Sequence, residues 1–153
     1  MQLSGWYFIV KGLAYAAWMY VGLRVFGRGG SQPHWIAAGL GALRLGMGLV
    51  FGFGIWIGST LIFEKIREVS RDVPDWIASS AAYLSVYVPV RWIEWGIFDL
   101  ALNRDARSTR GFFLGNSSRS RYWRAGGIGI SCIADIPLIV SLGGNIPLGR
   151  FMC

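Results

Sequence analysis

The chain has 153 residues, of which 54% are hydrophobic and 15% are charged, whereas a soluble domain carries about 25% charged residues. Its formal net charge is +7, but the basic residues gather in short segments between apolar runs, which is typical of membrane proteins and not of nucleic-acid-binding proteins. The composition therefore indicates a single integral membrane domain over residues 1–153, with no nucleic-acid partner.

The first apolar run covers residues 6–26 and is long enough to span a bilayer. It contains several aromatic residues and is interrupted by Lys11. Because Lys11 lies about one and a half turns from Trp6, we expect its side chain to extend to the membrane interface. A turn rich in glycine follows, and it holds the single histidine, His34.

The second apolar run, residues 35–63, contains one charge, Arg44. As a helix it would be roughly 43 Å long, which exceeds the ~30 Å hydrocarbon core of a bilayer. One side of its helical wheel carries small residues and the arginine: Ala37, Gly41, Arg44, Gly48, Gly52 and Ser59. A second row of small residues consists of Ala38, Ala42 and Gly46. Small residues let membrane helices approach closely, so we expect a central helix that packs through Gly41, Gly48 and Gly52.

The third apolar run, residues 76–102, is the most polar, and its Arg91 and Glu94 are close enough in sequence to pair along one helix. A polybasic loop follows over residues 103–125, and its aromatic residues indicate a position at the lipid headgroups. Its arginines are expected to contact anionic lipids: Arg104, Arg107, Arg110, Arg119, Arg121 and Arg124.

The last apolar run, residues 127–148, is short and contains two prolines and several glycines. The four runs predict an all-α integral membrane protein, a four-span helical bundle whose fourth span is short, broken or re-entrant. The excess of arginine places the polybasic loop on the inner side and both termini outside. A bacterial plasma membrane and a mitochondrial inner membrane both fit this pattern.

Four ionisable residues on three of these runs lie at a similar depth: Arg44, Arg91, Glu94 and Asp135. Counted along each helix, they are roughly 12–17 Å from the same membrane face. They are therefore expected to form a buried charge network that holds the helices in register, with Arg44 paired to Asp135 and Arg91 paired to Glu94. The alternative is a polar pocket, because ionisable residues inside a membrane are candidates for function.

The chemistry available to such a pocket is limited. One histidine and two cysteines do not supply a metal or haem site, so neither a metal nor a cofactor is expected. A serine or cysteine nucleophile would also lack a histidine base within the bilayer. The catalytic candidates are therefore the carboxylates Glu94 and Asp135, which would share a proton and activate water if they came within hydrogen-bonding distance.

Two short stretches resemble known families. Ile133-Ala134-Asp135, followed by IPLIVSLG, is similar to the last catalytic motif of lipoprotein signal peptidases, which use two intramembrane aspartates. The resemblance implies Asp135 as one catalytic residue and Glu94, within VRWIEW, at the position of the other. The sequence departs from that pattern, since Ser131-Cys132 replaces an aromatic-Asn pair and glutamate replaces aspartate. LRLGMGLVFGFG resembles the first helix of small membrane proteins of the DoxX type.

Three functional hypotheses follow. The first is a non-catalytic accessory subunit that packs against other transmembrane proteins in a complex, favoured by small-residue rows on more than one helix face and by eight tryptophans. The second is a membrane-embedded hydrolase or transferase of a lipid-linked substrate, with Glu94 and Asp135 as acid and base and Arg44 and Arg91 binding an anionic group. The third is a small proton-coupled transporter that uses Glu94.

Overall fold

The computed structural model describes residues 5–28, 30–70, 72–103, 109–115 and 117–141. Within these ranges the regular structure is entirely helical: α1 Gly5–Val25, α2 Pro33–Val69, α3 Asp75–Leu102, α4 Thr109–Leu114 and α5 Ser118–Ser141. The prediction of an all-α protein is confirmed for this part of the chain. Two helices are long and apolar enough to cross a membrane, namely Tyr7–Val25 within α1 and the whole of α2.

Local sequence determines where the helices end and begin. Gly27 has a positive φ of 69° just after α1, and Arg28 N donates a hydrogen bond to Leu23 O at 2.8 Å, so α1 ends in a Schellman motif. The hydroxyl of Ser117 accepts a hydrogen bond from Ser120 N at 3.1 Å and thereby caps α5. Glycine after one helix and serine before another thus fix both boundaries.

Two helices differ from the ranges expected for the membrane spans. Helix α2 continues to Val69, six residues beyond the predicted end at residue 63. Helix α5 begins at Ser118, so residues 118–125 of the predicted polybasic loop are helical. The reason is the serine cap at its start together with the burial of Trp123 and Arg124 on its first turns. Residues 142–148 of the predicted fourth span lie outside the described residues.

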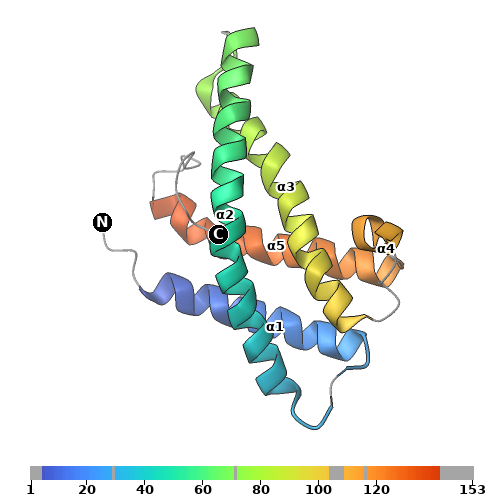
Figure 1. Ribbon diagram of the computed structural model, residues 1–153. Coiled ribbons are helices and arrows are strands. Elements are labelled where there is room, and N and C mark those ends of the chain that lie inside the picture. Colours follow the sequence, from blue (N-terminus) through green and yellow to red (C-terminus); the bar gives the residue numbers. More distant parts are fainter. Residues whose placement is uncertain (1–4, 29, 71, 104–108, 116, 142–153) are drawn as a thin grey trace.

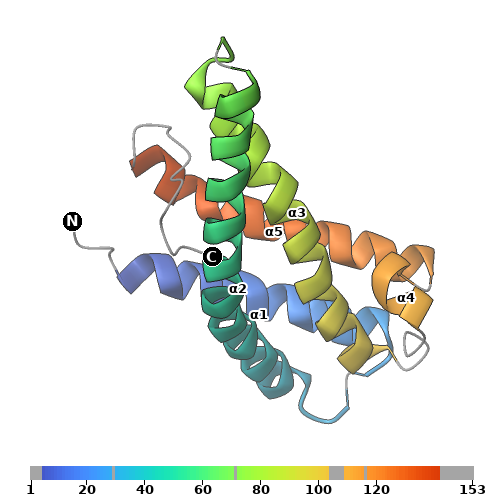
Figure 2. The same cartoon turned by 45° about the horizontal axis from the view of Figure 1, so that its top comes forward.

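The four long helices form two pairs that cross (Figure 1). Helices α2 and α3 form an antiparallel hairpin, and α1 and α5 run beside each other across it, as both Figure 1 and Figure 2 show. The ends of α1 and α3 and the start of α5 therefore come together near α4. The axes of the two pairs point in different directions, so position along one helix does not translate into the same depth on another.

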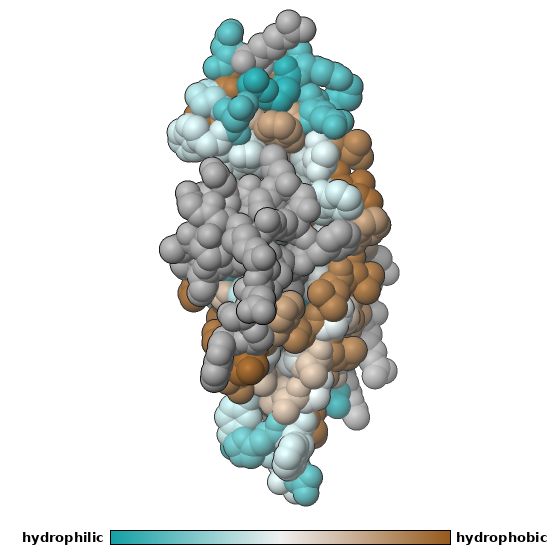
Figure 3. All heavy atoms as spheres, turned by 90° about the vertical axis from the view of Figure 1, so that its left-hand side faces the viewer, coloured by the Kyte–Doolittle hydropathy of each residue, from teal (hydrophilic) through white to brown (hydrophobic). Residues whose placement is uncertain are grey.

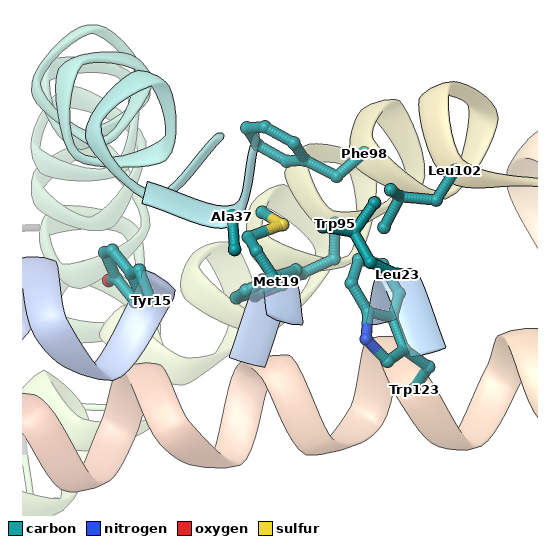
Figure 4. Close-up of a cluster of buried hydrophobic side chains, with 8 residues drawn as sticks. All are labelled: Tyr15, Met19, Leu23, Ala37, Trp95, Phe98, Leu102 and Trp123. Atoms are coloured by element: carbon teal, nitrogen blue, oxygen red, sulfur yellow. The ribbon is translucent and has the colours of Figure 1, made fainter. Parts of the chain in front are cut away.

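The hydrophobic core lies where the two pairs cross. Figure 4 shows side chains from α1, α2, α3 and α5 in one cluster: Tyr15, Met19, Leu23, Ala37, Trp95, Phe98, Leu102 and Trp123. Glycines permit this packing, since a Cβ atom added at Gly127 would lie 2.4 Å from the Trp95 ring. A Cβ atom at Gly41 would similarly lie 2.7 Å from the backbone nitrogen of Ala16. Helix α2 therefore contacts α1 backbone to backbone at Gly41.

On one face of the molecule, the described residues are largely apolar along the middle and polar at the ends (Figure 3). Figure 3 shows hydrophilic residues gathered at the two ends of one face, with hydrophobic residues between them. Large apolar side chains are exposed on α1 and α2, including Leu13 with 66% and Val50 with 74% of their surface accessible. Apolar exposure on this scale is characteristic of a surface that contacts lipid or another protein.

Candidate functional site

Three of the expected network residues meet in the protein interior. Arg44 on α2 and Arg91 on α3 both donate to the same oxygen, Glu94 Oε2, each at 2.6 Å. All three side chains are fully buried. Arg91 and Glu94 are three residues apart on α3, so one helix presents both partners to α2. This arrangement, here called the Glu94 cluster, connects α2 with α3.

Aromatic rings surround the arginines of the Glu94 cluster. The Arg44 guanidinium carbon lies 4.9 Å from the Tyr15 ring centroid and 5.2 Å from that of Trp95. Arg91 lies 4.9 Å from the Tyr87 ring centroid. Attraction between a cation and an aromatic face strengthens when water is absent. The rings thus offset part of the free energy lost when the guanidinium groups leave water.

Asp135 is in a different cluster from the other three. It pairs with Lys11 through its Oδ1 atom, which also accepts a hydrogen bond from the Tyr7 hydroxyl at 2.6 Å. The Lys11 ammonium donates to the Tyr7 hydroxyl at 2.8 Å, and Tyr87 donates to Asp135 Oδ2 at 3.3 Å. This Asp135 cluster ties α1 to α5 and, through Tyr87, to α3. The pairing of Arg44 with Asp135, which their similar depth indicated, does not occur.

The prediction that the Lys11 side chain extends to the membrane interface is wrong. Its side chain is fully buried, although the sequence places it near the start of an apolar helix. The reason is Asp135, which supplies an opposite charge from α5 at the place where α1 and α5 run side by side. An ammonium group inside an apolar bundle is tolerated when it is paired and hydrogen-bonded.

A third buried ion pair involves residues that sequence reasoning did not connect. Arg124 on α5 donates to Asp99 Oδ2 on α3 through Nε at 2.8 Å and Nη2 at 2.7 Å, and Ser120 contacts the same carboxylate. Arg124 also donates to the carbonyl of Gly111 in α4 at 3.1 Å. The side chain is fully buried, so Arg124 does not reach the lipid headgroups. The available signal was the four-residue spacing of Ser120 and Arg124, which places both on one helix face.

The remaining arginines of the predicted polybasic loop divide into two groups. Three of them are exposed: Arg110, Arg119 and Arg121. Arg104 and Arg107 lie outside the described residues. The packing glycines Gly41, Gly48 and Gly52 all lie on the buried side of α2. The structure therefore leaves the headgroup contacts of the exposed arginines and the role of the glycines in assembly as predictions.

The buried clusters have the chemistry of structural ion pairs. Glu94 and Asp135 accept hydrogen bonds from different donors, and none of the described contacts joins the two carboxylates. Among the described residues no group of histidine, cysteine, aspartate and glutamate is arranged to hold a metal ion. Glu94 instead links α2 with α3, and Asp135 links α5 with α1 and α3.

The chain matches none of the protein-family models, curated proteins or solved structures with which it was compared. Function is therefore argued from the geometry of the helices and of their charged residues.

Proposed function

We propose that this chain is a multi-pass integral membrane protein that serves as a non-catalytic subunit and packs against other transmembrane proteins. The single observation that carries the proposal is a row of small residues on the exposed face of α2. Four of its five members are alanine or glycine, and successive members are four residues apart, so that each lies beside the next as the row winds around the helix: Ala38, Ala42, Gly46, Val50 and Gly54. All five are exposed. We call this set the outer row.

The outer row has the features of a helix-packing surface. Its members Gly46, Val50 and Gly54 lie opposite the buried stripe that contains Gly41, Gly48 and Gly52. A Cβ atom added at Gly46 or Gly54 would meet nothing within 4 Å. Helices associate in lipid through small residues that let backbones come close, whereas contact with lipid chains does not require them. The outer row therefore fits a second transmembrane helix supplied by a partner.

The buried charges support a structural role over an enzymatic one. Catalysis by paired carboxylates would need Glu94 and Asp135 to share a proton or a water molecule. Glu94 is instead held by two arginines, and Asp135 by a lysine and two tyrosines. We infer that the Glu94 cluster and the Asp135 cluster fix the crossing of the two helix pairs.

The proposal includes four membrane segments, in a bacterial plasma membrane or a mitochondrial inner membrane. Two helices of sufficient length and apolarity and the exposed apolar side chains support the membrane location. The arginines near the ends of α1 and α3 favour an inner position for that side of the protein. Anionic lipids are the expected surroundings of Arg110, Arg119 and Arg121.

Purification from the native membrane in mild detergent tests the proposal. We expect the chain to copurify with one or more transmembrane proteins in fixed stoichiometry. Gly46→Leu and Gly54→Leu should release the partner while the isolated chain remains at least as resistant to thermal unfolding, because a Cβ atom at either position meets nothing within 4 Å and leucine favours the helix over glycine. Gly129→Leu is the matched control, since Gly129 is exposed on α5 with open space around it. Isolation of the chain as a monomer that has enzymatic activity without a partner would contradict the proposal.

A further inference from the structure

A pocket of about 670 Å³ lies where the ends of three helices meet. Figures 1 and 2 show the C-terminal ends of α1 and α3 close to the start of α5, beside α4. The pocket is lined by residues from these ends: Arg24, Val25, Phe26, Gly27, Asn103, Ser117, Ser118 and Arg119. Its volume is within the range of about 300–1,000 Å³ that is usual for small-molecule sites.

The lining has the composition of an anion site. Among the described residues that line it are two arginines, an asparagine and two serines, and none of these described residues carries a carboxylate. The hydrogen bonds that position the two arginines go to a tyrosine hydroxyl and a backbone carbonyl, and not to a carboxylate. Arg24 donates through Nε and Nη2 to the Tyr20 hydroxyl at 3.1 and 2.8 Å, and Arg119 donates through Nη1 to Val25 O at 3.4 Å. Both positive charges therefore remain available to a ligand.

Positioning of the arginines adds to this composition. Arg24 lies over the Tyr20 ring, with its guanidinium carbon 5.2 Å from the centroid. The bond from Arg119 to Val25 joins the start of α5 to the end of α1 across the pocket. Guanidinium groups recognise phosphate oxygens through paired N–H donors, and a group already held in place loses less side-chain entropy on binding.

We propose that this pocket binds the phosphate of an anionic lipid headgroup. The apolar lining residues Val25 and Phe26 lie at the end of α1, a helix long and apolar enough to cross a membrane. A lipid would place its phosphate between Arg24 and Arg119 and its glycerol against these apolar residues. The lipid source rests on the proposed membrane location, whereas binding of phosphate itself does not.

The test measures binding by calorimetry on the full chain purified in uncharged detergent. The probes are dihexanoyl phosphatidylglycerol, dihexanoyl phosphatidylcholine and inorganic phosphate. We expect phosphatidylglycerol to bind in a one-to-one ratio and more tightly than phosphatidylcholine, with inorganic phosphate as a competitor. Arg24→Gln and Arg119→Gln should each weaken phosphatidylglycerol binding by about tenfold, a size typical of one lost charge-assisted contact. Arg110→Gln, at an exposed arginine outside the pocket, should change it less than about twofold.

The remaining outcomes separate the alternatives. Binding of inorganic phosphate without phosphatidylglycerol would overturn the lipid source and leave a site for a free anion. Equal weakening by all three arginine variants would overturn the pocket in favour of a diffuse positive surface, and absence of any binding would overturn the proposal entirely. Copurification of a partner is measured separately, so failure of the subunit proposal and failure of the pocket are distinguishable.

Discussion

At the scale of single residues, the buried charges form pairs that the order of the sequence does not reveal. We predict that Lys11 and Asp135 are strongly coupled in their effect on stability. Removing one member leaves the other buried and unpaired, which lowers the free energy of unfolding by roughly 3–5 kcal/mol. Thermal unfolding in detergent of Lys11→Met, Asp135→Asn and the double variant measures the coupling, and the double variant should recover much of the loss.

The matched control for this double-mutant comparison uses Arg44 and Asp135, the pair expected from their similar depth in the membrane. Arg44→Met and Asp135→Asn should be coupled less strongly than Lys11→Met and Asp135→Asn, because Arg44 pairs with Glu94 and Asp135 pairs with Lys11. Strong coupling of Arg44 to Asp135, together with additive effects of Lys11 and Asp135, would contradict the pairing in the structure.

Lys11 illustrates what residue-level reasoning from the sequence misses. A lysine near the start of an apolar helix is usually able to extend to the interface. Whether it does so depends on the helix beside it, and here α5 brings Asp135 and α3 brings Tyr87 to the same place. By contrast, the pairing of Arg91 with Glu94 was predictable, since it depends only on their spacing along one helix.

At the scale of helices, the periodic spacing of small residues in α2 indicated which side of the helix is buried. The six residues that share one side of its helical wheel are all buried: Ala37, Gly41, Arg44, Gly48, Gly52 and Ser59. A regular helix carries this information in its sequence because its period is fixed. Helix α5 was harder to recognise, since its first turn is rich in serine and arginine, residues that are equally common in loops. The cap by Ser117 is a local signal that the surrounding charges obscured.

Two glycines of α5 should respond oppositely to alanine. Gly127→Ala places a Cβ atom against the buried Trp95 ring, so we expect the free energy of unfolding to fall by about 1–3 kcal/mol through overpacking. Gly129→Ala meets open space and should raise it by up to about 1 kcal/mol, because alanine favours the helix. Thermal unfolding of both variants in the same detergent gives the comparison. Equal effects would mean that α5 does not pack on α3 at Gly127.

At the scale of the whole molecule, the crossing of the two helix pairs explains why depth was a poor guide. Distances counted along helix axes compare fairly only when the axes are parallel. Helices α1 and α5 run across α2 and α3 (Figure 1), and Asp135 pairs with Lys11 whereas Arg44 pairs with Glu94. The helices could be predicted from the sequence. The angle between the two helix pairs could not, because it depends on packing among many residues, such as Trp95 against Gly127.

The orientation of the molecule leads to a labelling prediction. Ser118 is exposed at the start of α5, and Glu64 is exposed near the C-terminal end of α2. In a background with Cys132 and Cys153 changed to serine, an impermeant thiol reagent added outside sealed vesicles should label Glu64→Cys and leave Ser118→Cys unlabelled. Labelling of Ser118→Cys alone would reverse the predicted topology.

The central claim is that the outer row of α2 contacts another transmembrane protein, and photocrosslinking in the native membrane tests it most directly. A photoreactive phenylalanine analogue would replace Val50 in the outer row or, as the control, Leu13 on α1, which is also highly exposed. We predict that the probe at Val50 forms one discrete protein adduct of fixed stoichiometry, whereas the probe at Leu13 reacts with lipid. Reaction of both probes with lipid alone would contradict the claim that this chain is a subunit of a complex.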